Sequence, residues 1–283
     1  MKNPPKKARY IAFFLCISFA INHTFGQSNY FLTEDNSQQG NFEFGIQVGS
    51  NNFLGDLGGN IGKGSDFIKD YTLKTVRPLF GVSLNYYPLY WLNVIGGVNI
   101  TKVTGADSLI TNENGAERWR YNRNLSFRSP ITEGYIGAEI SILPLIDRGF
   151  ASKRFNPYVG VGVGFFHFNP QTMYKGKWID LKPLSLEGQG FAEYPDRKEY
   201  SLTQIYFPFT AGLRYIISDN LNISSGFIFR HTNTDYIDDV ATTYIDPALF
   251  DKYLSKTDAA IAKELYSRSK TCLLYTSPSP RDS

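Results

Sequence analysis

Bulky apolar side chains occupy every second position of the segment 157–168, which reads PYVGVGVGFFHF. Val159, Val161, Val163 and Phe165 share one parity, and the residues between them are glycines. A period of two indicates a β-strand, because successive side chains leave opposite faces of a strand. Glycine is in general a poor strand former, since it has no side chain to pack. The segment therefore predicts a strand with an apolar face on one side and very little space on the other.

The same alternation recurs along most of the chain, in segments of about the length that a tilted membrane-spanning β-strand needs. Including the segment 157–168, the alternating segments are 41–49, 77–87, 91–101, 135–143, 157–168, 205–215 and 221–231. No run of about 18 apolar residues follows the N-terminal region, which excludes a helical membrane span there.

The connections between these segments also differ in length. Residues 88–90 and 217–220 form short connections, and 144–156 is intermediate. The stretches 50–76, 104–130, 170–203 and the chain from 232 onward are long and polar. Short turns at one end and long loops at the other are typical of bacterial outer-membrane barrels. We therefore expect an all-β fold, a small antiparallel transmembrane β-barrel in the cell outer membrane, with outer-membrane lipid around it.

A soluble β-sandwich would also alternate, and it is the competing interpretation. Against it, the less bulky face carries Gly, Asn, Ser and isolated charges rather than the Lys, Glu and Thr of a solvated sheet. Pro208 lies in mid-strand, where a proline is tolerable at a bulge but awkward in a central strand. Aromatic residues also crowd the strand ends, as in a membrane-interface girdle; they are Tyr86, Tyr87, Tyr90, Trp91, Phe155 and Tyr158.

The N-terminal 26 residues have the composition of a signal peptide. Four basic residues precede the apolar stretch YIAFFLCISFAI, and Thr24 and Gly26 are small residues before Gln27. A short membrane anchor is the alternative, and a lipoprotein signal at Cys16 is disfavoured because the residues before it are large. We expect residues 1–26 to be a signal peptide and 27–271 to be the barrel with its long outer loops.

Charge and cysteine content exclude several classes of partner and of fold. The signal segment carries four of the 29 Lys and Arg residues and no acid, which leaves 25 basic residues against 26 acidic ones. A balanced chain gives no reason to expect nucleic acid as a partner. Only Cys272 remains after residue 26, so a disulfide framework is not possible.

The C-terminal end departs from the pattern. Bacterial barrels have an even number of strands, so an eighth should follow the seventh, yet 272–283 reads CLLYTSPSPRDS, without alternation. It resembles translated read-through of a sequencing-library adaptor, with a natural disordered tail as the alternative. We expect eight strands in the natural protein and seven here, which would leave the first and seventh strands with unpaired edges. Before this tail, Asp246 and Pro247 predict the start of a helix in the fourth outer loop.

Several charged residues fall on the inward parity of the strands. They are Glu43, Glu139, Arg214 and Arg230, with Arg77 at the mouth of the second strand. Lone buried ions are very costly, so we expect these groups to pair as a salt-bridged plug or simply as structural packing, and not to line a pore.

The sequence contains little that indicates catalysis. His167 and His231 fall near outer strand ends, where some lipid-modifying barrels carry a His and Ser pair, but no Ser, His and acid spacing is distinctive. The acidic stretch TDYIDDVATTYID has no ordered ligand spacing for calcium, and no phosphate-binding loop or zinc pattern occurs. We expect no enzyme activity, no catalytic residues, no metal, no cofactor and no small-molecule substrate.

The first long loop holds NNFLGDLGGNIGKG and is followed by KTVRPLFGVSLNYYP. With NPYVGVGVGFFHFNP, these stretches resemble the PorG-like outer-membrane β-barrel family of the type IX secretion system, over residues 40–271. The matching positions are Leu54, Gly55, Asp56, Leu57, Gly58, Gly59, Arg77 and Pro78.

The resemblance implies a non-enzymatic component of the secretion and gliding-motility machinery, associated with a periplasmic ring. We expect its ring subunits to contact the turn DRGFASKRFN, through Arg148, Lys153 and Arg154. Ordinary membrane-flanking positive charge explains these residues equally well. The alternative function is a generic small barrel for envelope stabilisation or adhesion.

Overall fold

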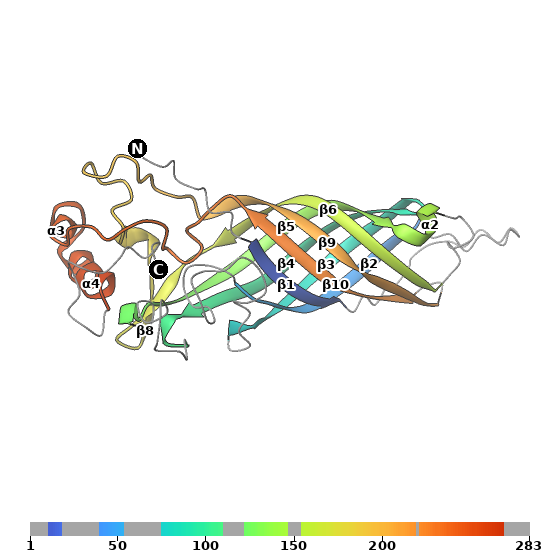
Figure 1. Ribbon diagram of the computed structural model, residues 1–283, viewed down its shortest axis with the longest axis horizontal. Helices are drawn as coiled ribbons and strands as arrows, with labels where there is room; N and C mark the ends of the chain where they lie inside the picture. Colours follow the sequence, from blue (N-terminus) through green and yellow to red (C-terminus); the bar gives the residue numbers. More distant parts are fainter. Residues whose placement is uncertain are drawn as a thin grey trace, which may run out of the picture.

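The computed structural model describes residues 40–53, 75–109, 122–146, 154–218 and 221–268, together with the backbone of 11–18. The chain forms a mostly antiparallel β-sheet curled into a half-barrel (Figure 1). The strand order is β1-β10-β9-β6-β5-β4-β3-β2. The strands are β1 (Ile11–Ser18), β2 (Phe42–Asn51), β3 (Arg77–Leu89), β4 (Leu92–Ala106), β5 (Ser126–Ser141), β6 (Phe155–Phe168), β9 (Thr203–Ser218) and β10 (Leu221–Thr232).

All seven alternating segments are strands, which confirms that interpretation of the sequence. Neighbours along the chain pair as antiparallel hairpins, and β6 pairs with β9 across the long connection between them. The strands β4 and β5 run further than predicted, because residues 104–106 and 126–130 of the expected loop continue the β4–β5 ladder. Pro208 makes no bulge: the β6–β9 ladder loses its pairs beside it and resumes in the same register at Tyr206.

The sequence predicts an unpaired edge on the seventh strand, which is β10, and this prediction is wrong. Strand β1 pairs with β10 over its whole length, from Ile11 opposite His231 to Ser18 opposite Ser224. The physical reason is that an unpaired edge offers free N–H and C=O groups to any available extended segment. Strand β1 lies within the predicted signal peptide, whose cleavage stays a prediction. The tail 272–283 lies outside the described residues.

The alternation of burial along the strands follows the sequence pattern. Exposed residues on β2 and β6 are the bulky ones of the pattern, while Glu43 and Gln47 on the opposite face are buried. We call the buried, concave side of the sheet its inner face and the other side its outer face.

The glycines of β6 lie where the inner face leaves no room for a side chain. A Cβ atom added to Gly164 would lie 2.5 Å from Cε1 of Tyr206 and 2.7 Å from the carbonyl oxygen of Gly134. Gly164 therefore makes space for the fully buried Tyr206 ring. Lack of space on the inner face explains why glycine, a poor strand former, alternates along β6.

We expect Gly164→Ala to lower the free energy of unfolding by about 1–3 kcal/mol, since overpacking forces neighbours to shift. Gly96→Ala is the matched control, because its added Cβ would meet no atom closer than 3.8 Å. Urea unfolding of both variants in detergent micelles measures the difference. Equal losses in the two variants would contradict this role of the inner glycines.

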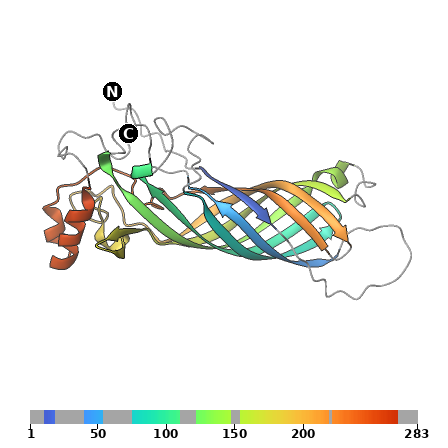
Figure 2. The same cartoon turned by 90° about the horizontal axis from the view of Figure 1, so that it is seen from below.

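One end of the sheet carries a folded cap, built from the β6–β9 connection and the chain after β10 (Figures 1 and 2). It contains the hairpin of β7 (Gln171–Tyr174) and β8 (Lys177–Asp180), the short helix η5 (Lys182–Leu184), and helices α3 (Leu249–Tyr253) and α4 (Lys256–Tyr266). The short helix η3 (Asp107–Leu109) follows β4, and α2 (Ile142–Ile146) lies at the opposite end of the sheet.

The cap has an apolar core of its own, with Leu184, Phe191, Phe250 and Leu265 almost fully buried. A second cluster, around Phe168, fills the end of the sheet beneath it. The helix expected from Asp246 is two helices, because Leu254 is extended and Ser255 starts α4 by accepting a hydrogen bond from the Asp258 N–H. Asp246 instead accepts a hydrogen bond from the Ala248 N–H before α3.

Candidate functional site

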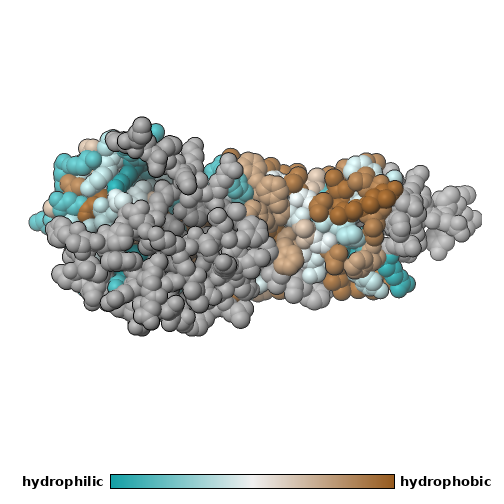
Figure 3. Space-filling view, viewed as in Figure 1, coloured by the Kyte–Doolittle hydropathy of each residue, from teal (hydrophilic) through white to brown (hydrophobic). Residues whose placement is uncertain are grey.

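The outer face of the sheet is apolar along its strands. Side chains there remain exposed to a degree unusual for large apolar groups, with Val161 and Phe165 both 59% exposed and Ile136 58% exposed. Figure 3 shows the hydrophobic residues gathered over the strands and the hydrophilic ones in the cap. Exposed apolar residues of this face include Phe42, Phe44, Ile46, Phe80, Val82, Leu84, Val98, Ile100, Phe207, Phe209 and Leu213. So large a contiguous apolar surface requires a partner, since soluble monomers rarely expose one.

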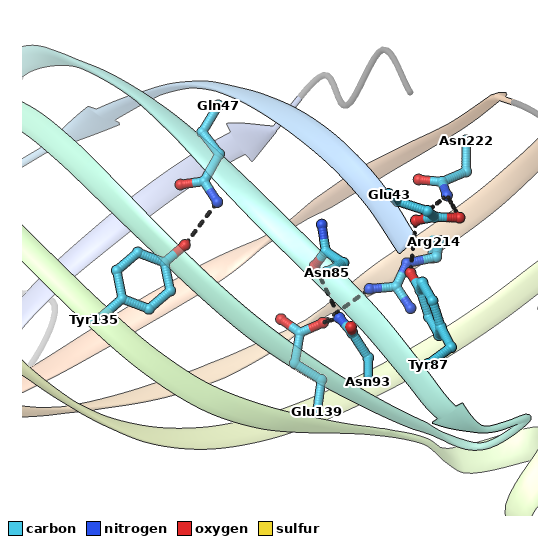
Figure 4. A network of polar contacts seen from close by, with 9 residues as sticks. All are labelled: Glu43, Gln47, Asn85, Tyr87, Asn93, Tyr135, Glu139, Arg214 and Asn222. Carbon is cyan, nitrogen blue, oxygen red and sulfur yellow. Dashed lines mark hydrogen bonds and ion pairs between the residues drawn. The ribbon is translucent and has the colours of Figure 1, made fainter. Parts of the chain in front are cut away.

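The inner face holds a first ion pair that joins the two strands on either side of β6. The Arg214 guanidinium on β9 lies 2.8 Å from Oε2 of Glu139 on β5, and both side chains are buried. The Asn93 amide on β4 donates to the same carboxylate at 2.9 Å and to Oδ1 of Asn85 at 3.0 Å. Figure 4 shows these groups converging inside the curled sheet. The predicted residues Glu139 and Arg214 are thus direct partners.

Glu43 on β2, an end strand of the sheet, contacts the strand next to the other end. Its carboxylate accepts a hydrogen bond from the Tyr87 hydroxyl at 2.8 Å and from the Asn222 amide at 3.0 Å. Asn222 lies on β10, so this contact spans the interior between strands that are not hydrogen-bonded neighbours (Figure 4). The Arg214 guanidinium also lies 5.5 Å from the centre of the Tyr87 ring, which places a positive charge near both carboxylates.

Arg230 has a partner that the sequence analysis missed. Its guanidinium makes two hydrogen bonds with the buried Glu133 carboxylate, at 2.6 and 2.8 Å. The Asn99 amide donates to the same carboxylate at 2.7 Å. Glu133 shares the parity of Glu139 on β5, so extending the alternation of 135–143 backwards by two residues would have found it.

A second missed pair closes the cap end of the β4–β5 hairpin. Asp107 is fully buried, and its two oxygens accept from Arg123 Nε at 2.8 Å and Arg123 Nη2 at 3.0 Å. Both residues lie in what the sequence predicted to be a polar loop.

Arg77 lies at one end of the sheet rather than midway along a strand. It is half-buried at the start of β3, and its guanidinium donates to the Val76 carbonyl at 3.1 Å. Pro78 of the family-like motif is exposed beside Ser50. The remaining motif positions Leu54, Gly55, Asp56, Leu57, Gly58 and Gly59 lie outside the described residues.

Two of the aromatic residues assigned to a membrane girdle lie on the inner face instead. Tyr87 is 3% exposed, and Tyr158 is buried with the Arg214 guanidinium 5.0 Å from its ring centre. Tyr86 and Phe155 do lie on the outer face. The error has a physical cause: an inward tyrosine satisfies buried charged groups with its hydroxyl or its ring, so an aromatic at a strand end does not by itself indicate the outer face.

The cavity inside the sheet is small, about 60 Å³, and the residues of the first ion pair line it. Because a single water needs roughly 10–15 Å³ of such space, the interior has room for a few waters. Gln47 occupies part of it, donating to the Tyr135 hydroxyl at 2.7 Å.

The predicted docking residues are only partly described. Arg154 is exposed next to the start of β6, and its backbone carbonyl accepts from the Ile216 N–H at 2.8 Å. Arg148 and Lys153 lie outside the described residues. The start of β6, which follows Arg154 directly, lies at the end of the sheet that carries α2 (Figure 1).

The two histidines of the alternating segments lie on β6 and β10. His167 is exposed on the outer-face parity of β6, with its Nδ1 3.1 Å from the Thr203 hydroxyl. Among the described residues, no three His, Cys, Asp or Glu side chains are placed to hold a metal ion. Within the same part of the chain, none of the helices has both the length and the apolar character to span a membrane.

The cap contains a buried carboxylate that fastens two of its loops. Glu187 accepts hydrogen bonds from the N–H groups of Ala241 and Thr242 and from the Thr242 hydroxyl, at 2.7–3.2 Å. Burial raises the pKa of Glu187, and these hydrogen bonds oppose the increase. Arg197 reinforces the junction by donating to the backbone carbonyls of Glu187 and Thr243.

Comparison of the chain with protein-family models, with curated proteins and with solved structures finds no match.

Proposed function

We propose that the protein is a small transmembrane β-barrel of a bacterial outer membrane, without enzyme activity, that serves as a structural component of a protein-secretion and gliding machinery of the type IX kind. In this proposal, the end of the sheet carrying α2 faces the periplasm and docks a ring of partner subunits. The cap then lies at the outer surface.

The observation that carries the membrane part of the proposal is the polarity of the sheet. Its outer face exposes large apolar side chains on strand after strand, and its inner face buries charged and amide groups. A soluble sheet buries its apolar face, so this arrangement is inverted with respect to a soluble protein and suits a lipid environment.

The interior supports a structural role rather than transport. The interior holds hydrogen-bonded carboxylates and guanidinium groups of Glu43, Glu133, Glu139, Arg214 and Arg230. The cavity among them has a volume of only about 60 Å³. Solute flux through a protein so filled would require these bonds to break. A liposome-swelling assay should therefore detect no solute flux.

The secretion role depends on the resemblance of the first long loop and of Arg77 and Pro78 to PorG-like proteins. We expect the reversed-charge variant Arg148→Glu, Lys153→Glu, Arg154→Glu to lose at least ten-fold of any co-purifying ring subunits, because opposed charges suppress association. The measurement is quantitative mass spectrometry of complexes purified in detergent from cells that express the full chain.

The matched control reverses three exposed lysines of the cap, Lys177, Lys198 and Lys256, and should leave the co-purifying proteins unchanged. If both variants retain the partners equally, the proposed docking surface is wrong, but the secretion role is not contradicted. Recovery of no periplasmic partner by the unaltered protein would remove the secretion role.

The folded cap favours a second candidate function, adhesion or envelope stabilisation through the outer loops. Its separate apolar core gives the loops a fixed shape, which a recognition surface needs. Binding of an external ligand in the absence of periplasmic partners would favour this candidate.

A further inference from the structure

A cavity of about 50 Å³ lies at the junction of the cap core and the cluster beneath it. Leu181 and Leu265 of the cap core and Val240 of the lower cluster form apolar walls. At roughly 10–15 Å³ for one water-sized group, the cavity has room for about three to five non-hydrogen atoms.

Three carboxyl groups line the same cavity, and all are buried. Glu187 comes from the β6–β9 connection, and Asp238 and Asp239 come from the chain after β10. Glu187 is used by the loop contacts described above, and Asp238 Oδ1 accepts from the Val240 N–H at 3.3 Å. The lining contains one cationic side chain, Arg268, whose guanidinium donates to the Thr172 hydroxyl and the Met173 carbonyl.

The two carboxylate oxygens of Asp239 have different surroundings. Its Oδ1 accepts from the Tyr200 hydroxyl at 2.6 Å, while its Oδ2 is buried and has no hydrogen-bond partner among the described residues. Asp239 is 2% exposed, so bulk water does not satisfy this oxygen. A buried carboxylate oxygen without a partner is costly unless a proton or a cation joins it.

We propose that this cavity is a binding site for a small primary ammonium ion, with its N–H groups on Oδ2 of Asp239 and its alkyl part against Leu181, Val240 and Leu265. A primary ammonium supplies hydrogen-bond donors and a compensating charge in one group. Its short alkyl chain matches the apolar walls and the size of the cavity.

The pKa of Asp239 makes the site dependent on pH. Burial is the largest cause that raises this pKa to about 8, and the nearby charge of Glu187 adds to it, while the Tyr200 hydrogen bond opposes it. The other acidic and phenolic groups around Asp239 are Asp238, Tyr236, Tyr244 and Tyr266. The neighbouring cations are Arg197 near Glu187, Arg123 near Asp238, Lys182 over the Tyr200 ring, and Arg268.

The sign of the pH dependence follows directly. Below pH 8, Asp239 holds a proton that competes with the ammonium ion, so affinity should rise as the pH increases through 8. An alkylammonium ion stays mostly protonated at about pH 9, as a lysine side chain does. Ethylammonium should bind roughly ten-fold more tightly at about pH 9 than at about pH 7, and binding at about pH 7 should release close to one proton.

The test is isothermal titration calorimetry of the full chain in detergent micelles with ethylammonium chloride, using buffers of different ionisation enthalpy to count protons. Asp239→Asn should weaken binding at least ten-fold. Asparagine tolerates the backbone of this position, where φ is +62°, so the variant should fold. Asp246→Asn is the matched control, since Asp246 is an exposed aspartate of the same segment, and it should bind as the unaltered protein does.

Tetramethylammonium carries the same charge without N–H donors and should not bind. The proposal is wrong if ethylammonium gives no saturable heat at about pH 9, if Asp239→Asn binds equally well, or if tetramethylammonium binds as tightly. If Asp239→Asn fails to fold, amide hydrogen exchange of the unaltered chain decides: bound ethylammonium should slow exchange at residues 238–242, and unchanged exchange would overturn the proposal.

Discussion

Replacing Arg230 by methionine should lower the free energy of unfolding by about 3–5 kcal/mol, the largest loss that we expect from a single inner-face substitution. The substitution removes both hydrogen bonds to Glu133 and leaves that carboxylate, which is 3% exposed, without its buried cation. The Asn99 amide remains bonded to Glu133 but carries no charge. Urea unfolding of the protein folded into lipid vesicles measures the loss.

The double variant Glu133→Gln, Arg230→Met separates a lost contact from an uncompensated charge. Removing both charges should recover at least half of the single-variant loss, because most of the cost comes from the lone buried ion. Arg154→Met, at an exposed arginine, is the control and should change stability by less than about 0.5 kcal/mol. A single variant that unfolds like the control would show that the pair contributes little to stability.

The alternation of residues was enough to place the strands and to assign most side chains to a face. It also put Glu139 and Arg214 on the same face, where they are 2.8 Å apart. The alternation could not identify which strands lie opposite one another across the interior. That depends on the curvature of the whole sheet, so the contact between Glu43 and Asn222 was not predictable from local sequence.

Glu133 was missed because the alternating segment was taken to begin at residue 135, after the long polar stretch 104–130. In the structure, Pro130 pairs with Lys102 inside the β4–β5 ladder, so the strand continues through the proline. Tyr87 and Tyr158 were assigned to the wrong face for a different reason. Their position at strand ends matched a membrane girdle, but tertiary contacts with Glu43 and Arg214 turn them inward.

The cap was beyond reach of pattern analysis for a different reason. Its core joins residues around 184, 191, 250 and 265 from two connections, and none of these stretches has a long regular period. The sequence identified a helical tendency after Asp246, and its division at Leu254 and Ser255 reflects a local cap. The Glu187 contact to Ala241 and Thr242 depends on the fold of both loops together.

Val161→Arg tests the environment of the outer face and with it the membrane proposal. Val161 lies midway along β6, and its side chain is 59% exposed. If lipid covers this face, an arginine near the middle of the bilayer should cost about 2–4 kcal/mol. If water covers it, an exposed strand position should accept arginine with a change within about 0.5 kcal/mol.

Met173→Arg is the matched control, because Met173 is also an exposed apolar residue of a strand, on β7 in the cap. Met173→Arg should change the free energy of unfolding little in either environment, since the cap lies beyond the apolar outer face of the strands. The free energy of unfolding in vesicles is measured for both variants, along with the fraction of folded protein that stays with the membrane. A large loss for Val161→Arg alone places lipid against β6, because the two substitutions introduce the same charge into the same secondary structure. Equal, small losses in the free energy of unfolding would mean that the outer face meets water or a protein partner. The proposed transmembrane barrel and its secretion role would then both be wrong.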